Sequence, residues 1–165
     1  MFFGHFFIGL MIKKYNFKLS LKILLISVML LDILALPGII DPNLILANPV
    51  WTHGFFIAMI WSGIFTLISL LFSRNLRTSL IYGFAVFSHW LLDFIAWPMD
   101  FGNGLVGLPL FLEGSPQIGL GLYSTLIGSL IGEIIGLLGV VIMIYILRRD
   151  RPLKVKNPNV QENNI

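Results

Sequence analysis

The sequence predicts an all-α protein, an integral membrane helical bundle with four to five transmembrane helices. The chain has 165 residues, of which 57% are hydrophobic and only 12% are charged, a composition far from that of an ordinary soluble domain. The apolar residues also lie in long stretches with few charges, as in membrane-spanning helices. A chain of this length holds one bundle and no separate soluble domain. We therefore assign residues 1–150 to a transmembrane helical domain and residues 151–165 to a polar, disordered C-terminal tail.

Five apolar stretches account for the predicted helices. They cover residues 2–12, 19–38, 51–73, 79–97 and 121–147. The last four approach or exceed the ~20 residues with which a helix crosses a bilayer. The first is shorter, and is either a short span or a helix that enters the membrane only partway. Glycines recur every three or four residues in the last stretch, at Gly128, Gly132, Gly136 and Gly139, which predicts a face for close helix packing.

The basic residues predict the orientation of the bundle. They are confined to residues 13–22, residues 74–77 and the segment after residue 147, whereas residues 39–50 and 98–120 contain no Lys or Arg. The positive-inside rule places the basic segments, and with them the C-terminus, in the cytoplasm. The N-terminus is then outside, or inside in a four-span alternative. Because the basic residues are divided among three connections, nucleic acid is not an expected partner.

Ionisable residues within the predicted spans are the main clue to function, because each costs roughly 2.5–3.5 kcal/mol or more at membrane depth. They are His5, Asp32, His53, His89, Asp93 and Glu133. With a rise of ~1.5 Å per residue, all six can meet in one pocket that opens to the extracytoplasmic side. His89 and Asp93 share a helix face, so they either ligate a common ion or hydrogen-bond each other. Cysteine is absent, which leaves histidine and carboxylates as the strong metal ligands.

Other residues near the outer connections have structural explanations. Trp51, Trp90 and Trp97 are typical of an interfacial aromatic belt. Asp41 precedes Pro42 and Asn43, a pattern typical of turns.

Four stretches carry a resemblance to a known family. They are GHFFIGLMI (4–12), LLDILALPGIIDPN (30–43), WTHGFF (51–56) and FSHWLLDFIAWPMD (87–100). Together they resemble the YdjM-like family of inner-membrane, metal-dependent hydrolases, in a multi-span branch with an SHWxLD element. The matching positions are His5 with Gly9, Asp32 or Asp41, Thr52 with His53, and His89 with Asp93. The resemblance implies a divalent metal, with zinc as the expected ion, hydrolysis of an ester or phosphoester, and the plasma (inner) membrane of a prokaryote.

The resemblance and the ionisable residues together suggest roles. The expected metal ligands are His53, His89 and Asp93, with His5 or Asp32 completing the shell and one position left for water. The expected general base is Glu133, Asp32 or Asp100. The substrate that fits best is a lipid or lipid-linked phosphoester reached from the outer leaflet. Beyond the lipid bilayer, the sequence identifies no partner and no oligomeric state.

Two other functions fit the same residues. A small transporter or proton-relay protein would use them along a pathway, which needs polar groups through the full membrane thickness. The inner halves of the predicted spans are almost entirely apolar apart from Ser and Thr, which favours a closed pocket. A non-catalytic assembly or regulatory protein would use them for helix association. A metal-dependent hydrolase is the first of these three hypotheses.

Overall fold

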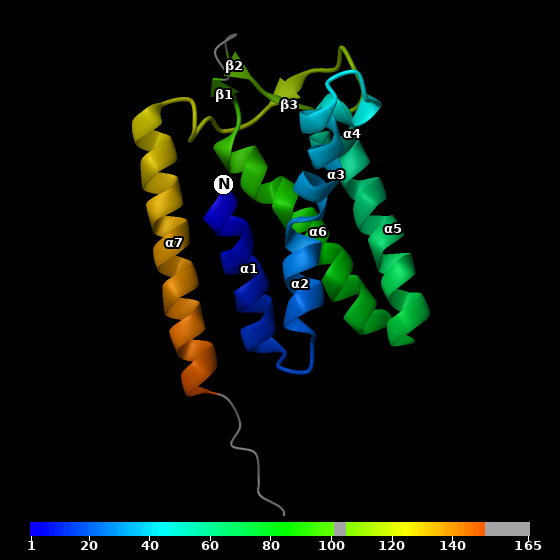
Figure 1. The fold of residues 1–165 in the computed structure, drawn as a ribbon, viewed down its shortest axis with the longest axis vertical. Coiled ribbons are helices and arrows are strands. Elements are labelled where there is room, and N and C mark those ends of the chain that lie inside the picture. Colours follow the sequence, from blue (N-terminus) through cyan, green and yellow to red (C-terminus); the bar gives the residue numbers. More distant parts are fainter. Residues whose placement is uncertain (101–104, 151–165) are drawn as a thin grey trace, which may run out of the picture.

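The computed structural model describes residues 1–100 and 105–150, except for the side chains of Ala47, Met99, Asp100 and Leu105. Most of this part is helical, so the prediction of a helical bundle is confirmed (Figure 1). Three helices are long and apolar enough to cross a membrane, namely α5 (Phe55–Ser73), α6 (Leu76–Ala96) and α7 (Leu126–Arg149). The helices α2 (Leu21–Val28) and α3 (Leu30–Ile40) form a fourth candidate span when taken together. The predicted tail, residues 151–165, lies outside the described residues.

The first helix, α1 (Phe2–Tyr15), is shorter than a full span. Its 14 residues rise only about 21 Å, whereas the hydrocarbon core of a bilayer is about 30 Å thick. It begins below the ribbon end of α7 and lies beside that helix (Figure 1). A fifth full-length span is therefore not supported.

The packing of α1 on α7 depends on glycines. A Cβ atom at Gly136 would lie 2.9 Å from the backbone nitrogen of Gly4, and one at Gly139 would lie 2.8 Å from the ring of Phe7. Side chains at either position would push the two helices apart. The predicted small-residue face is thus confirmed at these two glycines, which bring the start of α1 close to α7.

The second apolar stretch is broken, in contrast to the continuous helix predicted over residues 19–38. α2 and α3 meet at an angle of 54° around Met29, whose N–H bonds to the carbonyls of Ile26 and Ser27 in a tightened final turn. α3 then continues through Pro37 to Ile40. The break has a consequence for the site, because it leaves the Val28 carbonyl at the end of a helix, where carbonyls lack intrahelical partners.

The third apolar stretch is also divided. The short helix α4 (Val50–His53), which follows a 3₁₀ turn at Ile45–Ala47, ends at Gly54 before α5 begins. A Cβ atom at Gly54 would lie 2.7 Å from the carbonyl oxygen of Val50, so glycine permits this close approach. The break places His53 at the end of α4.

Two small antiparallel ribbons lie at the α4 end of the bundle (Figure 1). β1 (Met99–Asp100) pairs with β2 (Leu105–Val106), and β3 (Leu108–Pro109) pairs with β4 (Gln117–Ile118). They occupy the connection between α6 and α7, where only a loop was predicted. The opposite end holds the α1–α2 turn, the α5–α6 turn and the end of α7 (Figure 1), and therefore all the basic segments of the described chain.

The prediction of a tryptophan belt is wrong for two of its three members. Trp90 and Trp97 are only 6% and 7% exposed and belong to a core cluster with Leu31 and Leu108. Trp90 packs its ring against Phe55, Phe87 and Phe94. Burial of these large aromatic rings in the core is more favourable here than their placement at an interface. The rings pack against the helices that carry the ionisable residues.

Candidate metal centre

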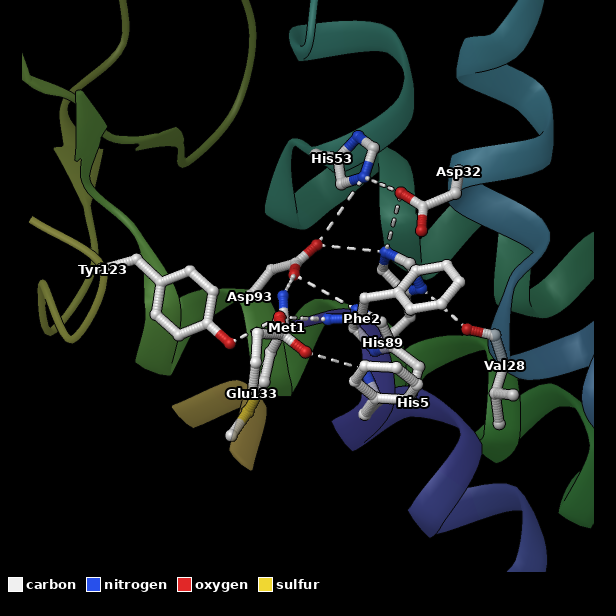
Figure 2. A network of polar contacts seen from close by, with 11 residues as sticks. Met1, Phe2, His5, Val28, Asp32, His53, His89, Asp93, Tyr123 and Glu133 are labelled. Carbon is white, nitrogen blue, oxygen red and sulfur yellow. Dashed lines mark hydrogen bonds and ion pairs between the residues drawn. The ribbon is translucent and has the colours of Figure 1, made fainter. Parts of the chain in front are cut away.

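Five ionisable side chains from four helices converge at one point in the bundle (Figure 2). His5 comes from α1, Asp32 from α3, His53 from the end of α4, and His89 and Asp93 from α6. Four of them are buried, whereas the Asp32 side chain keeps 41% of its surface exposed. The structure thus brings together all the residues expected to bind metal, and Asp32 with them.

His89 is the most completely enclosed member and has a fixed orientation. Its Nδ1–H donates to the Val28 carbonyl at 2.7 Å, which is the carbonyl left at the end of α2 by the break at Met29. Its Nε2 lies 3.1 Å from Asp93 Oδ2 and 3.4 Å from Asp32 Oδ1. Carboxylate oxygens only accept hydrogen bonds, so a cation has to lie between them and Nε2, either a proton or a metal ion.

His53 approaches the same two carboxylates from the other side. Its Nε2 lies 3.2 Å from Asp32 Oδ1 and 3.6 Å from Asp93 Oδ2, and its Nδ1 lies 2.8 Å from the Thr52 hydroxyl. When Nδ1–H donates to Thr52, the lone pair of Nε2 points at the carboxylates. A hydrogen bond of this kind on the remote nitrogen orients the imidazole of metal-binding histidines.

The two carboxylate oxygens of Asp93 face different partners. Oδ2 faces His53 and His89, whereas Oδ1 lies 3.4 Å from Nε2 of His5 and 3.6 Å from the α-amino group of Met1. The rings of His5 and His89 stack with centroids 3.7 Å apart and planes within 1°. His5 therefore contacts both Asp93 and His89, and it orients them as well as offering a nitrogen of its own.

The arrangement fits a metal ion. Two groups of ligands, one of His5, His89 and Asp93 and one of Asp32, His53 and His89, each keep their ligand atoms within 4.8 Å of one another. The separations of 3.1–3.6 Å between Nε2 of His53 or His89 and the carboxylate oxygens resemble the about 3.3 Å between ligands of a tetrahedral ion with bonds of about 2.0–2.1 Å. The two carboxylates also supply the charge that a divalent cation neutralises.

The two groups describe alternative ligand sets of one ion. They share His89, whose only nitrogen facing the cluster is Nε2, because Nδ1 is held by Val28. One lone pair binds one metal ion. The buried cluster could therefore hold a single metal ion, and its nitrogen and oxygen ligands do not by themselves determine which metal.

The other two expected catalytic residues, Glu133 and Asp100, are not among the five side chains that converge. Glu133 lies beside the cluster, where its carboxylate accepts hydrogen bonds from the Phe2 and Phe3 backbone and from Tyr123 (Figure 2). Asp100 is part of β1, and its side chain lies outside the described residues. Asp41 accepts from the backbone of Asn43 in a local turn, as expected of a turn residue.

Three further groups contact the ionisable residues, and of these the sequence had singled out only Thr52, through the resemblance that pairs it with His53. They are the Val28 carbonyl, which fixes His89, the Thr52 hydroxyl in its contact with His53, and the Tyr123 hydroxyl, which binds Glu133. Thr52 has a local signal, because it directly precedes a histidine. Val28 and Tyr123 have none, since a backbone carbonyl and a tyrosine in a loop carry no pattern.

Comparison with known proteins does not extend this description. The chain matches no protein-family model, no curated protein and no solved structure.

Proposed function

We propose that this chain is a membrane-embedded, metal-dependent hydrolase that acts on an ester or phosphoester at the cluster of His5, Asp32, His53, His89 and Asp93. The single observation that carries the proposal is the position of His89 Nε2, buried and facing two carboxylate oxygens at 3.1 and 3.4 Å. Ionisable side chains buried in this way in an apolar bundle indicate a functional site by default. The resemblance of the SHWLLD element to that of the YdjM-like family points to the same chemistry.

Each residue has a part in the proposed reaction. Zinc is the ion that the resemblance implies, and imidazole and carboxylate ligands are compatible with it. A divalent ion at this position supplies Lewis acidity, which polarises a scissile oxygen and makes water a stronger acid. His53, His89 and Asp93 would hold the ion, and His5 would orient Asp93. Asp32 is the partly exposed member, so it either completes the ligand set or takes the proton from the attacking water.

An apolar groove beside the cluster favours a lipid substrate. It is a cavity of about 450 Å³ between α1, α6 and α7, and its lining includes Gly4, Leu92, Gly139 and Ile142. Met1 also lines this groove, and its α-amino group lies 3.6 Å from Asp93 Oδ1, so the groove passes beside the cluster. An acyl chain along it would leave the scissile bond of a lipid or lipid-linked phosphoester at the proposed metal ion.

The charge distribution supports the orientation of the proposed site. All basic segments of the described chain lie at the end of the bundle opposite the ribbons and α4 (Figure 1). Under the positive-inside rule that end is cytoplasmic, together with the C-terminus. We therefore propose an extracytoplasmic-facing site in the plasma (inner) membrane of a prokaryote.

The test combines metal content with hydrolysis. The full chain, purified in detergent, is measured by mass spectrometry for bound metal and then incubated with a panel of phosphoesters and with phospholipid vesicles. We expect about one divalent ion per chain and hydrolysis that a chelator abolishes and added zinc restores. Bound metal without hydrolysis of any ester would favour the transport hypothesis, and absence of metal after gentle purification would favour an assembly role.

A further inference from the structure

Glu133, which the sequence suggested as a general base, has another set of contacts in the structure. Its Oε1 accepts a hydrogen bond from the Phe2 N–H at 2.8 Å and from the Tyr123 hydroxyl at 2.6 Å, and its Oε2 accepts one from the Phe3 N–H at 3.1 Å (Figure 2). Both carboxylate oxygens are therefore engaged. A general base needs a lone pair directed at the attacking water. The three donors occupy lone pairs of Glu133 that would otherwise accept that proton.

The hydrogen bonds to Phe2 and Phe3 meet a need of α1. The first N–H groups of a helix have no intrahelical partner and are usually satisfied by a side-chain cap. α1 has no side-chain cap hydrogen bond at its start and no acidic residue in its first turn. Glu133 provides both from α7, and its negative charge also interacts favourably with the positive end of the helix dipole.

Tyr123 strengthens this contact from the loop before α7. Burial, and then its hydrogen bond to Glu133, raise the pKa of the Tyr123 hydroxyl above its ordinary value. The hydroxyl therefore remains protonated and continues to donate at neutral and moderately alkaline pH. Glu133 is held between this donor and the start of α1.

The start of α1 also carries His5. His5 lies in the first turns of α1, where its N–H bonds to the Met1 carbonyl at 3.4 Å. Its ring stacks on His89 at 3.7 Å and its Nε2 lies 3.4 Å from Asp93 Oδ1. The close α1–α7 approach at Gly136 fixes the distance between Glu133 and this turn. A displacement of the first turn would therefore move His5 away from both partners.

We propose that Glu133 is a positioning residue of the metal centre, which caps α1 across the helix interface and thereby holds His5 against Asp93 and His89. This inference rests on the metal-binding part of the proposed function, but not on hydrolysis. It assigns Glu133 to the support of the cluster instead of to proton transfer.

The first experiment measures Co²⁺ binding to the full chain in detergent, with the visible spectrum of the bound ion as a second readout. We expect Glu133→Ala to weaken Co²⁺ binding roughly 10- to 100-fold, as loss of an outer-shell partner does, and to alter the spectrum. Glu133→Gln keeps an acceptor oxygen and should lose less. Ser129→Ala is the matched control on α7, because among the described residues the Ser129 hydroxyl bonds only to the Thr125 carbonyl within its own turn.

A double variant tests the route through His5. If Glu133 acts through His5, Glu133→Ala combined with His5→Ala binds Co²⁺ no more weakly than His5→Ala alone. Independent losses that multiply would overturn the proposal. Wild-type affinity and spectrum in Glu133→Ala, together with lost hydrolysis, would also overturn it and make Glu133 a catalytic residue.

A measurement without metal separates this inference from the proposed function. In protein labelled with ¹⁵N-histidine, we expect Glu133→Ala to shift the ring signals of His5 and His89, which Ser129→Ala leaves in place. Unchanged ring signals would contradict the positioning role. Shifted signals in a protein that hydrolyses nothing would support the positioning role and reject the hydrolase.

Discussion

The two ends of the bundle both carry charged side chains, but they satisfy them differently. At the cluster end, His89 is 0% and Asp93 is 3% exposed, and their partners come from α1, α3 and α4. At the basic end, Lys14 pairs with Asp150 and Arg149 pairs with Asp150, with side chains 26–65% exposed. Water solvates the second set, whereas only other protein groups or a bound ion can stabilise the first.

The exposed ion pairs and the buried ionisable groups differ in what they contribute to stability. Exposed ion pairs contribute little because water screens them and flexible side chains lose entropy in forming them. A buried charge that loses its partner is strongly destabilising, and buried ionic groups are often no better for stability than apolar ones. Retaining two carboxylates and three imidazoles inside an apolar bundle is therefore better explained by a ligand than by stability. Substitutions at the two ends should have effects of very different size.

The largest effect is expected at His89. Replacing it with alanine removes the Nε2 that faces Asp32 and Asp93, so metal content should fall by more than the roughly 10- to 100-fold typical of outer-shell changes. The matched control is Arg77→Ala, which changes the opposite end of the same helix, α6. Metal analysis of both variants at equal folded yield checks the prediction. Equal metal content in the two would remove the distinction between the ends.

A smaller effect is expected at Thr52. Thr52→Val keeps the shape of the side chain but removes the hydroxyl that lies 2.8 Å from His53 Nδ1. His53 then loses its orientation, and we expect about tenfold weaker metal binding. Thr66→Val is the control, because the one hydrogen bond of the Thr66 hydroxyl within the described part of the chain goes to the Ser62 carbonyl in α5. Titration with Zn²⁺ distinguishes them, and equal affinities would show that Thr52 does not orient His53.

Acid should distinguish the two ends in another way. Protons compete with a metal ion for the imidazole nitrogens, so metal affinity should fall as the pH is lowered from about 8 to about 6, by about tenfold per pH unit for each proton displaced. The hydrogen bond from Lys14, and then that from Arg149, lower the pKa of Asp150. Its stabilising contribution is therefore present above the unfolded-state pKa and is lost only as the pH falls through the lower folded value. Metal affinity is measured by dialysis at several pH values, and thermal unfolding is followed in parallel. We expect the metal affinity to fall over this range while the stabilising contribution of Asp150 remains.

Much of the fold was accessible from the sequence because it depends on hydropathy. The lengths of α5, α6 and α7 follow from runs of apolar residues, and the glycine spacing in α7 predicted close packing. The predicted meeting of His5, His53 and His89 also agrees with the structure, since costly residues inside apolar spans tend to find one another. These predictions need only average properties of long segments.

The remainder depends on individual contacts that no sequence pattern records. The break at Met29 comes from carbonyl bonding in one turn, and it creates the partner of His89. The pairing of Glu133 with Phe2 joins residues separated by 131 positions and depends on how α1 lies against α7. Trp90 was misassigned because its hydropathy suits an interface as well as a core, and only the packing of Phe55, Phe87 and Phe94 decides between them.

The smallest effect is expected from Asp150→Asn at the basic end. The substitution removes the ion pairs with Lys14 and Arg149, but it also removes a negative charge from the C-terminal end of α7, where the helix dipole disfavours it. The two changes oppose each other at an exposed position. We expect a thermal midpoint close to that of the wild-type protein and unchanged metal content. A loss of metal in this variant would contradict the prediction. It would mean that the ion pair of Lys14, at the end of α1, affects the position of His5 near the start of the same helix.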